Sequence, residues 1–524
     1  MDDFKRMKVF ENKNAFRIFH NTNYQFCETY PKVLVVPSQV SDDDIKEALL
    51  FRTSYILSFT HTQHTHTDTK HKQTGTKSRF PTLVFQSLET DSILYRSSQP
   101  RSGLQNRSEH DERYLQALAS TSSDSKLTIA DCRPRMNAMA QQILGGGTES
   151  SSYSDFVELV HLNIDNIHAV RKSFQQIFSL VKEQPPCSKW HAAVESTNWL
   201  KHIRTILRGA RHVSQELRRG RSCLVHCSDG WDRTPQVCAL AELMMDCYYR
   251  TIQGFIVLIQ REFMSFGHRF RQRVGVANSN HKDSQRSPVF QQFLDCVWQL
   301  TVMYPKRFEF NERFLIFISD HVVSARFSTF LFNSEKEHTN VDRCFWTYLK
   351  TSKKKRFLNK AFREDPTIMI PSHGAISTQI RLWDTYFLRW LPGILPEHVH
   401  DEDEEEENRR TSLKRLSRRL MQQQHEEEKE EDKTLLIENT ILTPSTPKKI
   451  IDSRAEKYGV EWEADEDRKE CSICRAEFHL LRRRHHCRKC GQIVCNACSK
   501  WRERVTTSDG EVKKGKRVCD HCRG

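Results

Sequence analysis

One short stretch of the chain combines a cysteine and an arginine in a pattern that can bind an anion. Cys227 and Arg233 bracket five residues, the apolar run 223–225 precedes them, and Pro235 with a helical pattern follows. This order predicts a buried strand, a tight loop with Gly230 at its bend, and a helix that begins near Pro235. The backbone N–H groups of such a loop and the N-terminus of a helix together bind anions such as phosphate.

These residue types favour nucleophilic attack on a bound phosphate. The field of the loop lowers the pKa of a cysteine, which predicts that Cys227 is a thiolate near neutral pH. The planar guanidinium of Arg233 suits bidentate phosphate binding. A thiolate held against a phosphate is the nucleophile of a phosphatase that works through a phospho-cysteine intermediate. A chance pairing of Cys and Arg is the alternative, but the strand before the loop and the helix after it argue against chance.

The residues inside the loop carry a resemblance to a known family. Residues 225–234, Val-His-Cys-Ser-Asp-Gly-Trp-Asp-Arg-Thr, resemble the signature of the myotubularin phosphoinositide 3-phosphatases, a branch of the cysteine-phosphatase superfamily. The resemblance implies an α/β, protein-tyrosine-phosphatase-like domain that acts on phosphatidylinositol 3-phosphate and the 3,5-bisphosphate. In that reading Cys227 attacks the D3 phosphate and Arg233 stabilises the transition state. The loop residues expected to contact substrate are Ser228, Asp229, Gly230 and Trp231.

A phosphatase of this kind also needs a general acid for the leaving inositol oxygen. Asp232 lies inside the loop and is the best candidate, and Asp229 is the next choice. Related phosphatases often take this acid from a separate loop, so that alternative stays open.

Further segments extend the resemblance over residues 20–395. Asn137 and Asn166 match asparagines that line the family's substrate pocket, although a capping or turn role would also explain each of them. Arg269 and Arg273 are four residues apart, so on a helix they share one face and can grip a second phosphate. A solvated basic face is the usual explanation of such a pair, but Arg269 lies in a run that matches the family's Ser-Phe-Gly-His-Arg-Phe motif and Arg273 follows it closely.

Composition limits the partners and the location of the protein. The chain has 524 residues and a formal net charge of +14, which favours more than one domain and an acidic partner. No secretory signal opens it and no apolar run approaches roughly 18 residues, so we expect a soluble, cytoplasmic protein. No nucleic-acid motif appears, so the expected partners are phosphoinositide lipids at a membrane surface, with room for a homo- or hetero-oligomer with related phosphatases.

The order of these features predicts four regions. We expect an N-terminal extension at 1–19, the phosphatase domain at 20–395, a charged linker at 396–460 and a zinc module at 461–524. The Thr- and His-rich stretch 59–78 interrupts the phosphatase-like run, and a disordered insertion explains it better than a metal site. The family usually carries a lipid-binding domain before the phosphatase domain. This chain has no room for one, so we expect a truncated or divergent member.

Four C-x2-C pairs dominate the last segment. Their eight thiolates are enough for two tetrahedral, structural Zn²⁺ sites, and metal binding must supply much of the folding free energy of so short a segment. The chain has seventeen cysteines, but this paired spacing indicates metal binding in a reducing compartment and not disulfides. Spacing alone does not fix which pairs share an ion. The expected ligands are Cys471, Cys474, Cys487, Cys490, Cys495, Cys498, Cys519 and Cys522.

The residues between these cysteines resemble a FYVE domain. The run 483–488 is Arg-Arg-His-His-Cys-Arg, Trp462-x-x-Asp465 lies upstream, and Arg517-Val-Cys519 lies downstream. The resemblance implies that the first and third pairs hold one zinc and the second and fourth hold the other. A RING-like finger with histidine ligands is disfavoured, because cysteines already fill all eight positions. The residues implied to bind phosphatidylinositol 3-phosphate are Asp465, Arg483, Arg484, His485, His486, Arg488 and Arg517.

The two resemblances together predict a phosphoinositide 3-phosphatase that its zinc module docks on endosomal membranes as a peripheral protein. Phe478, Leu480 and Leu481 match a loop that dips into the bilayer, and a small local core is the alternative. Two other functions stay open. One is a catalytically silent phosphoinositide-binding adaptor, and the other is a protein phosphatase that acts on phosphotyrosine or phosphoserine.

Overall fold

The chain divides into two compact units, residues 1–400 and 401–524. Each is described here by itself. The computed structural model describes residues 1–11, 15–52, 78–101, 108–143, 147–149, 155–183, 189–275, 284–338, 343–351, 354–389, 460, 463, 468–479, 482–507 and 512–523. The predicted insertion, apart from Ser78, and almost all of the predicted linker lie outside these residues.

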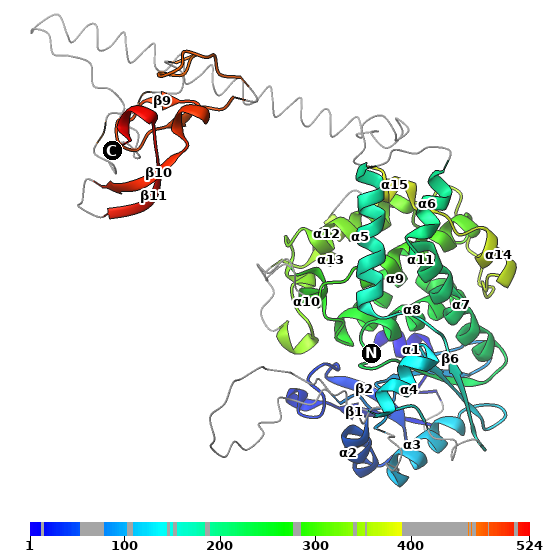
Figure 1. The fold of residues 1–524 in the computed structure, drawn as a ribbon. Coiled ribbons are helices and arrows are strands. Elements are labelled where there is room, and N and C mark those ends of the chain that lie inside the picture. The colour runs from blue at the N-terminus through cyan, green and yellow to red at the C-terminus, as the bar shows by residue number, and fades with distance from the viewer. Residues whose placement is uncertain are drawn as a thin grey trace, which may run out of the picture. The chain divides into compact units, whose positions relative to one another are not determined.

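A five-stranded sheet with the order β3-β4-β7-β5-β6 lies at the centre of the first unit (Figure 1). β3 (Thr82–Gln86) pairs with β4 (Ile93–Ser97) in the antiparallel direction, and the other pairings are parallel. β7 (Ser222–His226) lies between β4 and β5 (Leu127–Asp131), and β3 and β6 (Val157–His161) are the edge strands. Every residue of β7 is buried, as its unbroken apolar run predicts for a strand covered on both faces. The predicted α/β class is confirmed.

Helices pack against this sheet. α2 (Asp42–Phe51) packs on α3 (Glu109–Ala119), which contacts β5. α7 (Trp199–Arg218) and α8 (Arg233–Met245) pack on each other, and both contact β7. In Figure 1, α2 and α3 lie at the lower end of this unit, and α9 (Ile252–Ile259), α11 (Val289–Met303) and α12 (Glu312–Val323) lie in its upper half.

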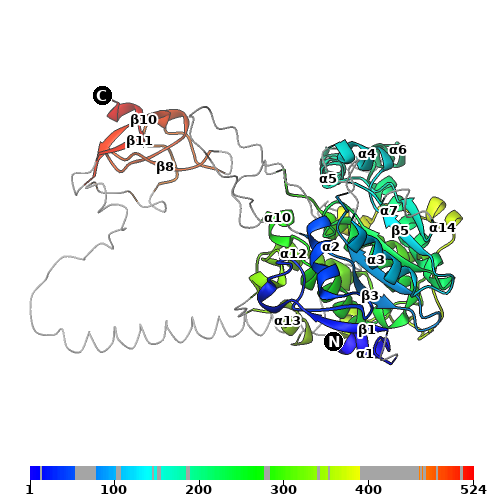
Figure 2. The same ribbon diagram turned by 90° about the horizontal axis from the view of Figure 1, so that it is seen from below.

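The remaining elements complete the first unit (Figure 2). An antiparallel pair, β1 (Phe16–His20) and β2 (Val33–Pro37), forms a separate two-stranded sheet. Phe4, Met7 and Val9, which lie in or just after α1, belong to the same hydrophobic core as the central sheet. The other helices are α1 (Asp2–Arg6), α4 (Arg135–Ile143), α5 (Ile167–Glu183), α6 (Trp190–Ser196), the short π-helix Gln260–Ser265, α10 (Phe270–Val274), α13 (Phe345–Thr351), α14 (His373–Thr378) and α15 (Asp384–Phe387).

The second unit is small and cysteine-rich. Two antiparallel pairs form it: β8 (His485–His486) with β9 (Ile493–Val494), and β10 (Trp501–Thr506) with β11 (Val512–Val518). Its buried cluster consists mainly of cysteines, with few aliphatic side chains. Within the described parts of both units, no helix is long and apolar enough to span a bilayer.

Candidate active site and zinc centres

The conformation of the loop between β7 and α8 is fixed by its own backbone and by contacts with the end of β4. Gly230 has φ +76°, and a Cβ atom at this position would collide with the carbonyl oxygen of Ser97. The backbone N–H of Gln99 donates to the carbonyl oxygen of Ser228 at 3.1 Å. Glycine is therefore required at the bend, both for its left-handed conformation and for the close approach of β4.

Two buried arginines fix the Gly230 carbonyl group. Arg79 and Arg96 each donate to this oxygen at 2.8 Å. Arg96 also pairs with the buried carboxylate of Glu262 at 2.7 Å. Sequence reasoning did not identify these anchors. The only signal was an arginine in each of two otherwise apolar segments, because buried arginines require partners such as these.

The Cys227 sulfur lies in the environment that favours a thiolate. The Cys227 side chain is almost fully buried, and its Sγ accepts hydrogen bonds from the Gly230 N–H and the Thr234 hydroxyl, each at 3.2 Å. Burial alone would raise the pKa of the thiol, but the charge of Arg233 and the Thr234 hydrogen bond outweigh it and hold the pKa below its usual value. The Arg233 guanidinium donates to the Ser228 hydroxyl at 3.4 Å, so it lies across the loop.

Asp232 forms a buried ion pair. Its two carboxylate oxygens accept from Arg273 at 2.9 and 2.7 Å, and Nδ1 of His268 lies 3.3 Å from Oδ1. Burial opposes ionisation, but Arg273 and His268 outweigh it and hold the pKa of Asp232 far below its usual range. Asp232 therefore carries no proton near neutral pH in this structure. Its predicted role as general acid stays a prediction and requires this ion pair to open.

The arginines expected to hold a second phosphate lie beside the loop. Arg269 is the N-cap residue of α10, and Arg273 lies within this helix, where its backbone N–H donates to the Arg269 carbonyl oxygen at 2.8 Å. Both side chains reach the loop. The Arg269 guanidinium carbon lies 5.0 Å from the centre of the Trp231 ring, a cation–π contact, and Arg273 pairs with Asp232.

The two candidate asparagines, Asn137 and Asn166, lie at different helices and differ in their hydrogen bonds. Asn137 is exposed on α4. Asn166 is also exposed, and its Oδ1 accepts from the backbone N–H groups of His168 and Ala169 at 3.0 and 3.2 Å, so it caps the start of α5. It lies two residues after Ile164, whose carbonyl oxygen accepts from Arg233 at 3.3 Å, so this cap is close to the loop.

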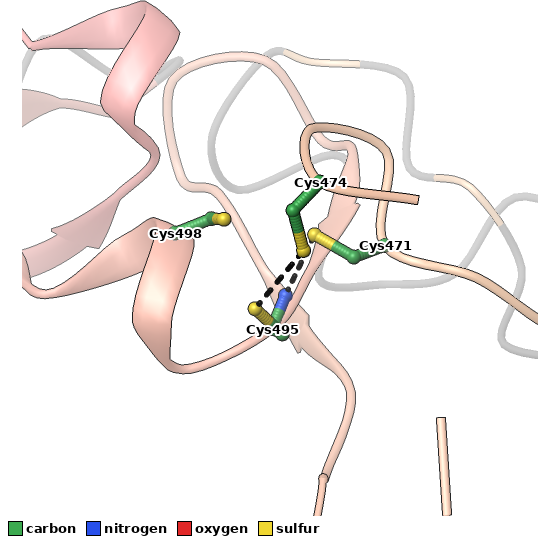
Figure 3. A group of neighbouring side chains, drawn as sticks. All are labelled: Cys471, Cys474, Cys495 and Cys498. Carbon is green, nitrogen blue, oxygen red and sulfur yellow. Dashed lines mark hydrogen bonds between the residues drawn. The ribbon is translucent and has the colours of Figure 1, made fainter. Parts of the chain in front are cut away.

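Eight cysteines form two tetrads in the second unit. Cys471, Cys474, Cys495 and Cys498 form one group (Figure 3), and Cys487, Cys490, Cys519 and Cys522 form the other. Within each group the sulfur atoms all lie within 4.8 Å of one another. Four thiolates at about 2.3 Å from a tetrahedral Zn²⁺ lie about 3.8 Å apart. The Cys474–Cys495 and Cys490–Cys519 sulfur distances of 3.8 and 3.9 Å fit that geometry.

The tetrads confirm the interleaved pairing, with the first and third pairs in one group and the second and fourth in the other. Backbone N–H groups also point at the sulfurs: that of Cys495 donates to Cys471 at 3.2 Å, and that of Cys519 donates to Cys487 at 3.3 Å. Such bonds stabilise thiolates in place and so support metal binding. The zinc ions would be structural, because cysteine fills every ligand position.

The basic motif of this unit lies on and around β8. Nε2 of His486 lies 2.7 Å from the carbonyl oxygen of Glu463, and Arg484 donates to the carbonyl oxygen of Arg468 at 3.1 Å. Arg517 donates to the Ser499 hydroxyl at 2.9 Å. Arg483 is exposed, His485 and Arg488 are half-buried, and Asp465 lies outside the described residues. Burial and the neighbouring arginines lower the pKa of His485.

The hydrophobic residues before the basic motif are only partly described. Phe478 packs against the cysteine cluster, and the Arg484 guanidinium carbon lies 5.1 Å from the centre of its ring. This contact matches the local core that was the alternative for Phe478. Leu480 and Leu481 lie outside the described residues.

A strand, a loop with a cysteine and an arginine six positions apart, and a helix define the class of cysteine-dependent phosphatase folds. Comparison with known families agrees. The profile of the myotubularin-like phosphatase domain matches residues 1–339, and that of the FYVE zinc finger matches residues 461–524. The chain belongs to the myotubularin-like phosphatase family.

Several curated proteins are similar to this chain. Myotubularin of Xenopus tropicalis is 41% identical over 404 residues, which are 75% of this chain and 62% of that protein. The phosphatidylinositol-3,5-bisphosphate 3-phosphatase MTMR2 of Bos taurus is 40% identical over 391 residues, which are 73% of this chain and 57% of that protein. The chain thus spans less than two thirds of the length of these relatives. The solution structure of the LM5-1 FYVE domain from Leishmania major is 35% identical over 15% of this chain and 87% of that domain, with a TM-score of 0.12.

Proposed function

We propose that the protein is a phosphoinositide 3-phosphatase that removes the D3 phosphate of phosphatidylinositol 3-phosphate and the 3,5-bisphosphate. The observation that carries this proposal is the buried Cys227 sulfur, which accepts from Gly230 and Thr234 inside a loop that Arg233 spans. Membership of the myotubularin-like family and similarity to the phosphatidylinositol-3,5-bisphosphate 3-phosphatase MTMR2 support the substrate class.

In the proposed reaction the Cys227 thiolate attacks phosphorus and displaces the inositol oxygen, which takes a proton from Asp232 or Asp229. Loop N–H groups and Arg233 hold the non-bridging oxygens as charge develops. Water then hydrolyses the phospho-cysteine and regenerates the thiolate. Arg269 and Arg273 contact loop residues and are proposed to bind a second phosphate, which would favour the bisphosphate head group.

The zinc module is proposed to dock the enzyme on the lipid that it consumes. Its basic motif at residues 483–488 and its match to the FYVE profile support binding of phosphatidylinositol 3-phosphate. We propose the domain limits 20–395 and 461–524, with Phe4, Met7 and Val9 of the N-terminal extension packed into the core of the first domain. We also propose a peripheral position on endosomal membranes and a cytoplasmic location. Docking would raise the local substrate concentration without adding a catalytic contact.

The test is phosphate release from short-chain phosphatidylinositol 3-phosphate by the wild type and by Cys227→Ser, with a phosphotyrosine peptide in parallel. We expect lipid turnover by the wild type only. Turnover of the peptide in preference to the lipid would favour a protein phosphatase. No turnover by a folded wild type would favour the adaptor function instead.

A further inference from the structure

A row of buried ionisable groups leads away from the nucleophile. His226 directly precedes Cys227 at the end of β7 and is fully buried. Its Nδ1 lies 3.2 Å from the carbonyl oxygen of Cys227, and its Nε2 lies 3.2 Å from a carboxylate oxygen of Glu149. Both ring nitrogens face acceptors, an arrangement that only the doubly protonated, charged imidazolium satisfies completely.

Glu149 is held from its other side by a second ion pair. Nη1 of Arg52 lies 3.1 Å from the other Glu149 oxygen, and Arg52 donates to both oxygens of Asp111 at 2.6 and 2.9 Å. All of these side chains are almost completely buried. The charges alternate along the row from Asp111 to His226, so each buried charge has an opposite neighbour, as buried ions require.

Among the described residues, the other titratable and charged groups near His226 contact one another and not the imidazole ring. Asp131 pairs with His226 in the β5–β7 register, but its carboxylate accepts from Arg133 at 2.7 Å. His161 lies 3.6 Å from the same carboxylate, and burial lowers its pKa, so it adds no positive charge near neutral pH. Glu149 is thus the carboxylate that contacts the imidazole directly.

The balance of these groups favours a charged His226. Burial alone would lower its pKa, and Arg133 acts in the same direction. The carboxylates of Glu149 and Asp131 outweigh both effects and raise the pKa of His226 above its usual value. A positive charge one residue from Cys227 then adds to the effect of Arg233 on the thiol.

We propose that Glu149 is a positioning residue for the nucleophile, because its carboxylate holds His226 in the protonated form and that charge supports the Cys227 thiolate. Glu149 acts through His226 and touches neither the sulfur nor the substrate position. The inference rests on the proposed function only for the use of the thiolate. The charge state of Cys227 can be measured without any turnover.

The test is the pH dependence of Cys227 alkylation by iodoacetamide in the full chain, followed by mass spectrometry of the peptide that contains this residue. Glu149→Gln keeps the size of the side chain and removes its charge. We expect its alkylation midpoint to rise by about one pH unit, which is about a tenfold slower reaction below both midpoints. The control is Glu216→Gln, which removes a buried carboxylate that accepts from Arg219 and Arg221 away from the loop and should leave the midpoint unchanged.

Two further variants separate the charge from the shape of the side chain. Glu149→Asp retains the charge, so its midpoint should lie between those of the wild type and Glu149→Gln. His226→Asn can still donate to the Cys227 carbonyl but carries no charge. In that background Glu149→Gln should shift the midpoint no further.

Three results would overturn the proposal. They are an unchanged or lowered midpoint in Glu149→Gln, a full shift in Glu149→Asp, and an undiminished effect of Glu149→Gln when His226 is already replaced. Should Glu149→Gln not fold, an unshifted midpoint in His226→Asn would overturn the proposal alone. If the wild type does not turn over the lipid but the alkylation midpoints shift as expected, the proposed function is contradicted and this inference stands.

Discussion

At the scale of single residues, the site depends on side chains that determine the ionisation state of Cys227 and of Asp232. Cys227 is buried, which by itself would disfavour a thiolate, and Arg233 and Thr234 reverse that preference. Asp232 is ionised for the same reason, since burial disfavours its charge but Arg273 binds both of its carboxylate oxygens. The surroundings thus favour the deprotonated form of both the nucleophile and the candidate acid, and Asp232 can donate a proton only after its own surroundings change.

Arg273 gives a prediction about substrate preference. Arg273→Gln removes a positive charge from the place proposed for the second phosphate, so it should raise KM for the 3,5-bisphosphate about tenfold or more and affect the monophosphate less. Steady-state kinetics on both short-chain lipids measures this preference. Arg204→Gln, which removes a positive charge that pairs with Glu195 away from the loop, is the control. An equal loss for both lipids would show that Arg273 acts only by holding Asp232.

Gly230 gives a second prediction at this scale. Gly230→Ala forces a Cβ atom against the Ser97 carbonyl in a left-handed backbone conformation, so the loop must shift. We expect kcat to fall at least 100-fold on the lipid. The free energy of unfolding should fall by about 1–3 kcal/mol. Gly374→Ala, where the nearest atom to an added Cβ is 3.9 Å away, is the control. Wild-type turnover by Gly230→Ala would show that the loop geometry is not required.

At the scale of elements, buried polar contacts tie the helices together. The Trp199 indole of α7 donates to the Asp295 carboxylate of α11 at 2.7 Å, and Gln299 donates to its other oxygen at 2.8 Å. Burial raises the pKa of Asp295 to about 7 in spite of these two hydrogen bonds. The protonated carboxyl is therefore the form that the folded state prefers at mildly acidic pH.

This shift predicts a pH dependence of stability. In the unfolded chain the pKa of an Asp is about 3.9, so between about pH 4 and pH 7 the folded state binds one proton more than the unfolded state. The stability that Asp295 contributes is therefore largest below pH 4. It declines by up to about 1.4 kcal/mol per pH unit until about pH 7.

Asp295→Asn tests this directly, because an amide does not titrate. Chemical denaturation of wild type and variant at several pH values should show the variant gaining relative stability from pH 5 to pH 7. A constant difference across that range would contradict the raised pKa.

Some parts of the site come from one continuous segment of the chain, and others come from segments far apart in the sequence. The strand, the loop and the helix around Cys227 follow one another in the chain, so spacing and residue type were enough to predict them. The anchors Arg79 and Arg96, and the row from Asp111 to Glu149, reach the loop from distant segments, and no local pattern marks such contacts. The four-residue spacing of Arg269 and Arg273 is also a local signal, and the structure has Arg269 at the N-cap of α10 and Arg273 inside that helix.

At the scale of the whole molecule, the chain joins a phosphatase-like unit to a metal-dependent one. The second unit has few buried aliphatic side chains, so its stability depends on its two cysteine tetrads. The family resemblance predicted which C-x2-C pairs share a zinc ion, because sequence spacing alone left this open. The sulfur–sulfur distances in the structure fit tetrahedral Zn²⁺ coordination.

The two tetrads predict how zinc removal affects the protein. Cys495→Ser should lower the zinc content from two ions to one per chain and abolish binding to phosphatidylinositol 3-phosphate vesicles. Turnover of the short-chain lipid in solution should change little, because that cysteine belongs to the other unit. Metal analysis, vesicle co-sedimentation and turnover assays measure the three effects. Cys247→Ser, a cysteine of the first unit outside both tetrads, is the control, and loss of zinc from it would contradict the assignment.

The most direct test of the central claim is whether phosphate passes through Cys227. Short-chain phosphatidylinositol 3-phosphate radiolabelled at the D3 phosphate is mixed with the full chain, and the reaction is quenched in acid within milliseconds. The account predicts label on the peptide that contains Cys227 in the wild type and none in Cys227→Ser. Lipid turnover without any label on this cysteine, or turnover that survives Cys227→Ser, would contradict it.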